Sequence, residues 1–254
     1  MEKSDRIVLV TGGSRGLGRD MAISLAAKGF HVVLTYQGNA SKAAEVVSEI
    51  ESQDRIGAAL QLDVSDAASF GDFAKTLKET LSSKFPSAKI FGLVNNAGTG
   101  YHATFEATAD EGFQAMFDIH LKGPFFLTQI LLPMMENGGS IVNISSGLTR
   151  FTFPGYAAYA SMKGGIEVLT HYLAKELGQR KIRANTVAPG AIETDFGGGA
   201  VRDNKELNAM ISSLTALGRV GLPDDIGGVV AFLCNDDSKW INAQRIEVSG
   251  GSLI

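Results

Sequence analysis

IVLVTGGSRGLG, at residues 7–18, joins a four-residue apolar run to a loop with glycine at positions 12, 13, 16 and 18. An amphipathic helical pattern follows at 17–28. Glycine lets a backbone turn sharply and lets a ligand approach it closely. The unpaired N–H groups and the dipole of a helix N-terminus favour anions. A strand, a glycine loop and a helix in this order predict a site for the pyrophosphate of a dinucleotide, here with the spacing G-x-x-x-G-x-G.

The rest of the chain repeats this alternation of short apolar runs with longer amphipathic stretches. Runs typical of buried strands lie at 7–10, 31–36, 58–62, 90–94, 140–144, 182–187 and 245–248. Helical patterns lie at 17–28, 41–53, 66–84, 109–135, 156–179 and 224–235. The alternation predicts one doubly wound, Rossmann-type α/β domain over residues 1–254, with a seven-stranded parallel sheet and helices on both faces.

One long segment, residues 190–223, stands outside this alternation. Excursions of this length in a compact domain are usually functional. We expect a lid over the substrate with its own helix and with a hinge at the three glycines of residues 197–199. A loop without a role in substrate binding is the alternative.

Composition excludes several classes of protein. The 254 residues hold 23 Lys and Arg against 27 Asp and Glu, a net charge of −4, which predicts no nucleic-acid or anionic-membrane surface. The single cysteine, Cys234, rules out a disulfide framework and a cysteine-based zinc site, and its apolar surroundings predict an inert buried thiol. We expect no metal. No signal peptide or membrane span is recognised, so we expect a cytoplasmic protein.

Two features bear on the choice of dinucleotide. An NAD site generally places an acid at the end of the second strand to hold the ribose 2′-hydroxyl, but residues 34–39 read LTYQGN. Arg15, inside the glycine loop, is placed to meet a 2′-phosphate, although it can also be a solvated loop charge. The pattern favours NADP(H) over NAD(H). Asp63, after the third strand, either accepts from the adenine amino group or caps a helix that starts near Ser65.

Acid–base chemistry is indicated around residues 140–165. Tyr159 and Lys163 are four residues apart on a predicted helix and share one face. A neighbouring ammonium is expected to lower the phenol pKa and make Tyr159 an acid or base near neutral pH. Ser145 and Ser146 end the fifth strand, where a hydroxyl can bond a substrate carbonyl. One of the two serines is expected only to cap a turn.

Taken in order along the chain, these motifs resemble the short-chain dehydrogenase/reductase family over nearly the whole sequence. Ser146 lies thirteen residues before Tyr159, which matches the spacing of the family's catalytic serine and its Tyr-x-x-x-Lys pair. The cofactor loop (Thr11, Gly12, Gly16, Gly18), the NNAG motif at 95–98, the turn of Pro189, Gly190 and Thr194, and the C-terminal stretch with Ser249, Gly250 and Gly251 also resemble the family.

The resemblance implies a reaction and a set of site residues. NADPH would deliver hydride to the carbonyl of a ketone or aldehyde, reversibly, while Tyr159 donates a proton, Ser146 holds the oxygen and Lys163 lowers the phenol pKa and binds the nicotinamide ribose. A homotetramer, built through 109–135, 156–179 and the C-terminal strand, is implied as well. The predicted cofactor contacts are Gly12, Ser14, Arg15, Gly16, Leu17, Gly18, Tyr36, Asp63, Val64, Asn96, Ala97, Gly98, Tyr159, Lys163, Pro189, Gly190, Ile192 and Thr194.

The sequence departs from the family at His120. The segment FDIHLKG at 117–123 carries this histidine where the family usually has a catalytic asparagine, in F-D-x-N-x-K-G, that helps hold a water as a proton relay. We expect His120 to be neutral beside Lys163, because two cations repel, and predict an active enzyme with an altered pH–rate profile. The alternative is that His120 only packs and the relay is lost.

The substrate side is predicted to be apolar and aromatic. Its candidate residues are Tyr101, His102, Phe151, Phe153, Tyr156 and Phe196. Alternatives to a carbonyl reductase are an NAD-dependent alcohol, sugar or steroid dehydrogenase and a non-catalytic nucleotide-binding regulator. The sequence names neither the substrate nor the physiological direction, because fold does not determine either.

Overall fold

A computed structural model describes residues 5–254; residues 1–4, where the N-terminal stretch begins, lie outside it. Its centre is one parallel sheet of seven strands in the order β3-β2-β1-β4-β5-β6-β7. The strands are β1 (Ile7–Val10), β2 (His31–Tyr36), β3 (Gly57–Gln61), β4 (Ile90–Asn95), β5 (Met135–Ile144), β6 (Arg183–Pro189) and β7 (Arg245–Val248). The chain crosses the sheet between β3 and β4, so the predicted doubly wound fold is confirmed.

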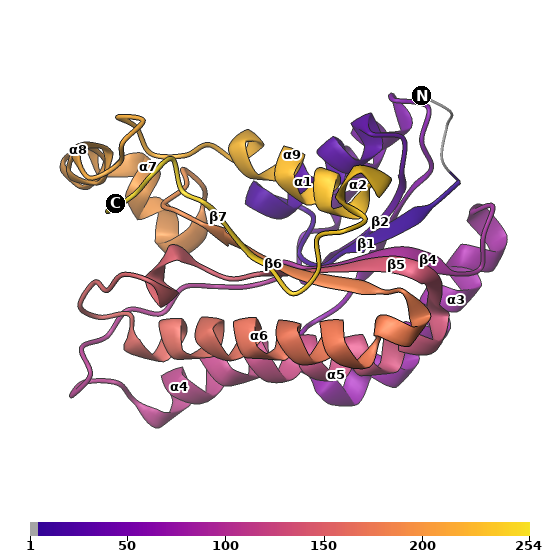
Figure 1. Ribbon diagram of the computed structural model, residues 1–254, viewed down its shortest axis with the longest axis horizontal. Helices are drawn as coiled ribbons and strands as arrows, with labels where there is room; N and C mark the ends of the chain where they lie inside the picture. Colours follow the sequence, from indigo (N-terminus) through magenta and orange to yellow (C-terminus); the bar gives the residue numbers. More distant parts are fainter. Residues whose placement is uncertain (1–4) are drawn as a thin grey trace.

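Helices cover both faces of this sheet (Figure 1), with α1, α2 and α9 on one face and α3, α4, α5 and α6 on the other. Their bounds are α1 (Gly16–Ala27), α2 (Ala40–Glu51), α3 (Phe70–Lys84), α4 (Asp110–Phe117), α5 (Gly123–Leu131), α6 (Ala157–Glu176), α7 (Ala200–Asp203), α8 (Lys205–Ser213) and α9 (Asp224–Cys234). None of the helices in the described part of the chain has the length and apolar character needed to cross a membrane.

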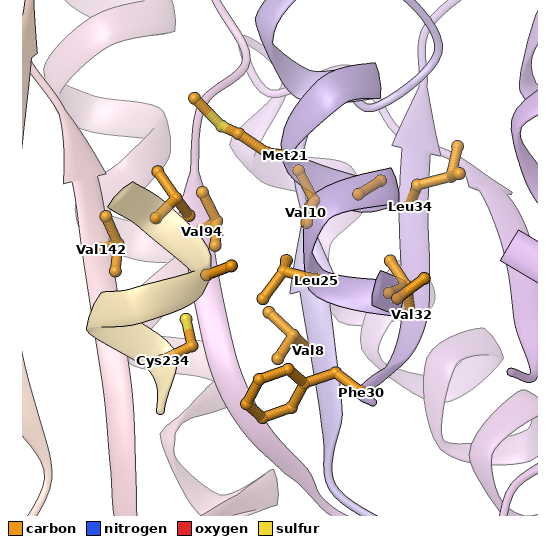
Figure 2. Close-up of a cluster of buried hydrophobic side chains, with 14 of the residues drawn as sticks. Val8, Val10, Met21, Leu25, Phe30, Val32, Leu34, Val94, Val142 and Cys234 are labelled. Atoms are coloured by element: carbon orange, nitrogen blue, oxygen red, sulfur yellow. The ribbon is translucent and has the colours of Figure 1, made fainter. Parts of the chain in front are cut away.

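Each strand of the centre is buried on both faces. Val8 and Val10 pack toward α1 and α9, while Ile7 and Leu9 face the helices on the opposite side. Figure 2 shows the first of these clusters, in which Cys234 also lies. Burial raises the pKa of the Cys234 thiol to about 12, so the predicted buried, unreactive cysteine is confirmed.

The helical pattern predicted over 109–135 is interrupted. After α4 a π-helical turn occupies Asp118–Lys122, and the Gly123 N–H bonds to the Asp118 carbonyl five residues back. Pro124 has no N–H, and its ring would crowd the carbonyl of His120, four residues before it. The wider π turn relieves this conflict. The stretch then ends before Met135, which begins β5, so the predicted C-terminal boundary of the helix is wrong.

Because the strands are parallel, the loops after β1, β4, β5 and β6 meet at one edge of the sheet. Ligands of such folds bind at this edge, next to the point where the chain reverses its direction of winding. The segment 190–223 extends from the same edge and contains a 3-10 turn at Phe196–Gly199 followed by α7 and α8.

Candidate active site

The glycine loop between β1 and α1 leaves its backbone open to a ligand. Gly12 and Gly16 have φ values of +66° and +53°, and a Cβ on Gly18 would overlap the Gly12 carbonyl. Arg15 is the N-cap of α1, but its side chain caps no N–H group. Backbone N–H groups of the first turn of α1 are therefore available to a phosphate, and the loop fits the pyrophosphate of a dinucleotide. Ser14 and Leu17 belong to this same loop and turn.

The loop after β4 is bonded to the glycine loop. Asn96 Nδ2 donates to the carbonyl oxygens of Thr11 at 2.9 Å and Gly12 at 3.3 Å, and the N–H groups of Asn96 and Ala97 both donate to Thr11 Oγ1 at 3.0 Å. The Asn96 side chain thus holds the glycine loop in shape. Direct contact of Asn96 with a cofactor stays a prediction.

Asp63 is bonded within its own turn. Its Oδ1 accepts from the N–H and hydroxyl of Ser65 at 2.9 Å and 2.6 Å, and its Oδ2 accepts from Gln37 Nε2 at 2.8 Å. The bond from the Ser65 hydroxyl is the main reason that the pKa of Asp63 is lowered. Asp63 therefore closes a turn with Ser65, but the predicted helix cap is wrong, because the 3-10 turn Ala67–Ser69 that precedes α3 is capped by Asp66. An adenine contact of Asp63 stays a prediction.

Positively charged side chains lie near the end of β2, where residues 34–39 contain no Asp or Glu. The Arg15 side chain is 68% exposed, and its Nη1 lies 3.9 Å from Asp195 Oδ2. Arg202 bonds the same carboxylate, and Arg202, Arg15 and Lys42 all lower the Asp195 pKa. Lys42, in the first turn of α2, was not predicted, although its place just after the 34–39 segment was a usable signal.

The two serines after β5 have separate tasks. Ser145 is buried and donates to Glu167 Oε1 at 2.7 Å. Ser146 caps the 3-10 turn Gly147–Thr149 by accepting from the Leu148 N–H at 3.2 Å, and its hydroxyl faces that of Tyr159 and lowers the Tyr159 pKa. The structure therefore brings Ser146, and not Ser145, to the phenol.

Tyr159 and Lys163 lie one turn apart on α6, and both are buried. Lys163 Nζ lies 5.6 Å from the centre of the Tyr159 ring and donates to the Ile144 carbonyl at 2.7 Å. Burial lowers the Lys163 pKa to about 7. Burial also raises the Tyr159 pKa above its ordinary value, and the Ser146 bond opposes this effect only in part. The predicted lowering of the phenol pKa is not seen in the ligand-free protein, because burial removes water from the hydroxyl and Lys163 does not offset this effect.

His120 stands on the π turn beside this pair. Its ring is 2% exposed and meets the Tyr159 ring edge-on, at 5.1 Å between centres and 87°. Nε2 lies 2.8 Å from the Thr99 carbonyl, so in the neutral ring Nε2 carries the hydrogen. Nδ1 is buried with no partner among the described residues. Burial first, and then Lys163, lower the His120 pKa to about 3, so the predicted neutral state is confirmed with burial as the larger cause.

The turn after β6 approaches the glycine loop. The Gly190 N–H donates to the Val248 carbonyl at 3.0 Å, and a Cβ on Gly190 would press on Ser249. Ile192 pairs with Gly221, which anchors the far end of the 190–223 segment. Thr194 reaches Gly16, where a Cβ would lie 3.6 Å from the threonine side chain. A cofactor on the glycine loop would therefore lie beside this turn. Direct contact of Pro189, Gly190, Ile192 and Thr194 with a cofactor stays a prediction.

The 190–223 segment covers the phenol. The Phe196 ring lies 5.8 Å from the Tyr159 ring, centre to centre, and packs on the backbone of Gly100. All three glycines that follow Phe196 have positive φ, between +60° and +79°. The other predicted substrate residues pair with each other or pack on glycines: His102 with Tyr156, Phe151 with Phe153, and Tyr101 on Gly112.

Glu167 is a site residue that the sequence analysis missed. It lies one turn beyond Lys163 on α6, and its Oε1 accepts from Ser145 Oγ and Thr149 Oγ1, each at 2.7 Å, and from Arg245 Nε at 2.8 Å. This carboxylate ties α6, the loop after β5 and β7 together directly behind Ser146. Residues 159, 163 and 167 are each four positions apart, which places them on one face of the helix, and this spacing could have identified Glu167 from the sequence.

Comparison with known proteins supports this geometry. Residues 12–252 match the family model described as enoyl-(acyl carrier protein) reductase. A 3-oxoacyl-(acyl-carrier-protein) reductase of Staphylococcus aureus is 37% identical over 98% of both chains. A hydroxynaphthalene reductase-like protein of Metarhizium majus is 33% identical over 98% of this chain and 95% of its own. The crystal structure of an angucycline C-6 ketoreductase, LanV, with bound NADP is 34% identical and superposes with a TM-score of 0.93 over 99% of this chain and 96% of that one.

Proposed function

This chain belongs to the short-chain dehydrogenase/reductase family and is an oxidoreductase, and on that premise we propose that it reduces a ketone or aldehyde to an alcohol with NADPH, reversibly. The observation that carries the proposal is the meeting of three groups at the ligand-binding edge of the sheet. The Ser146 hydroxyl faces that of Tyr159 and lowers the Tyr159 pKa, and the buried Lys163 amine lies 5.6 Å from the centre of the Tyr159 ring.

The side chains divide the reaction between them. When bound, the reduced nicotinamide supplies hydride to the carbonyl carbon. Tyr159 donates its proton to the carbonyl oxygen, and because burial raises its pKa the phenol is held in its protonated, donating form. Ser146 bonds the same oxygen and orients it. Lys163, with a pKa of about 7, exchanges protons at neutral pH and can resupply the phenol.

His120 completes this arrangement as a neutral group. Its Nδ1 is a bare acceptor in the buried space beside Tyr159, since Nε2–H is committed to Thr99. Nδ1 can accept a hydrogen bond from a water or from an amine. The asparagine that is usual in the family would hold a water in the same way. With a pKa of about 3 the imidazole itself does not carry the proton at neutral pH.

Several features support NADP(H) over NAD(H). Residues 34–39 have no carboxylate to bond a ribose 2′-hydroxyl. Arg15 and Lys42 provide positive charge at this end of β2, where a 2′-phosphate would lie. Gly12, Gly16 and Gly18 would hold the pyrophosphate, and Ile192 and Thr194 the nicotinamide. LanV, with NADP bound, has the same fold.

We also propose a homotetramer in the cytoplasm. Exposed aromatic side chains on α5 and α6 support contacts between copies, since Phe125, Phe126 and Tyr172 are 44%, 43% and 62% exposed. Single copies seldom leave such a surface to water.

Cofactor oxidation tests the proposed activity. Wild-type protein, given NADPH or NADH with a panel of aldehydes and ketones, should oxidise NADPH when a carbonyl is present and should use NADH less efficiently. Tyr159→Phe should lower kcat by roughly 100-fold or more, because the proton donor is lost. Thr76→Val, which removes an exposed hydroxyl from α3, is the control and should keep full activity. Equal activity of Tyr159→Phe and wild type would refute the mechanism.

A further inference from the structure

The substrate side of the phenol is built from rings that rest on bare backbone. Phe196 packs on Gly100, Phe151 on Gly147 and His102 on Gly155; at each glycine a Cβ would press into the ring. Because glycine has no side chain, each ring can lie directly against the main chain. The result is a set of flat, closely supported aromatic surfaces around Ser146 and Tyr159.

Phe196 is the member of this set that touches the reactive phenol. Its ring contacts Tyr159 at 5.8 Å between centres with a 58° tilt, and it remains 44% exposed. Behind it, Cβ atoms on Gly197 and Gly198 would meet nothing within 4 Å. Open space therefore lies beside these two glycines, next to the exposed side of Phe196.

The charged side chains near Tyr159 help to distinguish two substrate classes that the relatives suggest, carrier-linked acyl groups and fused-ring aromatic compounds. A carrier-linked acyl substrate brings an acidic protein or a phosphate, which calls for available cations. The two arginines of the nearby loops are both committed: Arg150 to Glu247 at 2.6 Å and to the Ser252 and Leu253 carbonyls, and Arg202 to Asp195 and Asp203. In the described part of the chain, the substrate side of Tyr159 therefore presents rings, and both of these loop arginines are already paired with carboxylates.

Resting on the proposed function, we propose that the substrate is an uncharged fused-ring aromatic ketone, and that its ring packs on the exposed side of Phe196 beside Tyr159. Offset or edge-on contact with Phe196 would place the ring while its carbonyl oxygen faces Ser146 and Tyr159. The likeness to a hydroxynaphthalene reductase-like protein agrees with this class, since hydroxynaphthalene is a fused-ring aromatic compound.

A matched pair of ketones tests the ring contact. 1-Tetralone and 1-decalone share a fused bicyclic skeleton, but only 1-tetralone is aromatic; an N-acetylcysteamine 3-oxoacyl thioester stands for the acyl class. Wild type should show a kcat/KM for 1-tetralone at least 10-fold above that for either of the others. Phe196→Leu should lower the tetralone-to-decalone ratio by roughly 2- to 10-fold, mainly through KM, whereas Phe196→Tyr should keep it. Phe232→Leu, on α9 and 40% exposed, is the control.

The outcomes separate the two proposals. If wild type with NADPH reduces none of the carbonyls, the proposed function is overturned. If it reduces the thioester or 1-decalone as well as 1-tetralone, or if Phe196→Leu leaves the ratio unchanged, only the ring proposal is overturned. Calorimetry of 1-tetralone binding in the presence of NADP⁺ measures the contact apart from turnover, and equal affinity of wild type and Phe196→Leu would also overturn the ring proposal.

Discussion

Replacing His120 tests whether this buried imidazole is neutral in the folded protein. Its pKa is about 3 against an ordinary value of 6.5 for a histidine in water, because burial and the neighbouring Lys163 disfavour the cation. Between these two values the unfolded chain binds one more proton than the folded chain. Stability should therefore fall as the pH drops below 6.5, by about 1.4 kcal/mol per pH unit and by about 2.5 kcal/mol at pH 4.5 from this group alone.

His120→Asn removes the titrating group, so its free energy of unfolding should depend less steeply on pH. Urea unfolding at pH 4.5, 5.5, 6.5 and 7.5 measures this slope, and comparing slopes cancels the pH-independent cost of the smaller side chain. His171→Asn, on the exposed face of α6, is the control. Parallel curves for wild type and His120→Asn below pH 6.5 would show that His120 is protonated in the folded protein and would refute the reasoning.

The same substitution bears on the reaction. Since the imidazole stays neutral from pH 5 to 9, any difference between wild type and His120→Asn in the pH–rate profile must come from shifted pKa values of Lys163 or Tyr159. An unchanged profile would mean that His120 only packs beside the phenol.

Three further changes test other parts of the site. Gly18→Ala should weaken NADPH binding at least 10-fold in a fluorescence titration, because its Cβ would overlap the Gly12 carbonyl, while Gly71→Ala, with open space around it, should not. Asp195→Asn should tighten NADPH binding about 2- to 5-fold and leave NADH binding unaffected, since it removes a carboxylate that competes for Arg15; equal changes for both cofactors would contradict this. Glu167→Ala should lower the free energy of unfolding by about 1–3 kcal/mol in urea melts, because it removes the carboxylate that accepts from Ser145, Thr149 and Arg245 together.

Much of the site could be anticipated from local patterns. The glycine loop, the spacing from Ser146 to Lys163 and the missing acid at 34–39 are all properties of neighbouring residues, and each lies at the predicted edge of the sheet. Helix boundaries were less certain. The π turn at Asp118–Lys122 depends on a clash between Pro124 and a carbonyl one turn earlier, which apolar periodicity does not register.

The sequence by itself determined the parallel sheet, the dinucleotide loop and the identity of the acid–base pair, because periodicity and helix spacing are short-range geometry. Only the tertiary structure decided that Glu167 supports the loop behind Ser146, where Phe196 rests, and how each titrating group is charged. Those outcomes depend on which distant segments surround a side chain and remove its water. For this reason burial is the largest cause both of the raised pKa of Tyr159 and of the lowered pKa of His120, to which Lys163 adds a smaller effect.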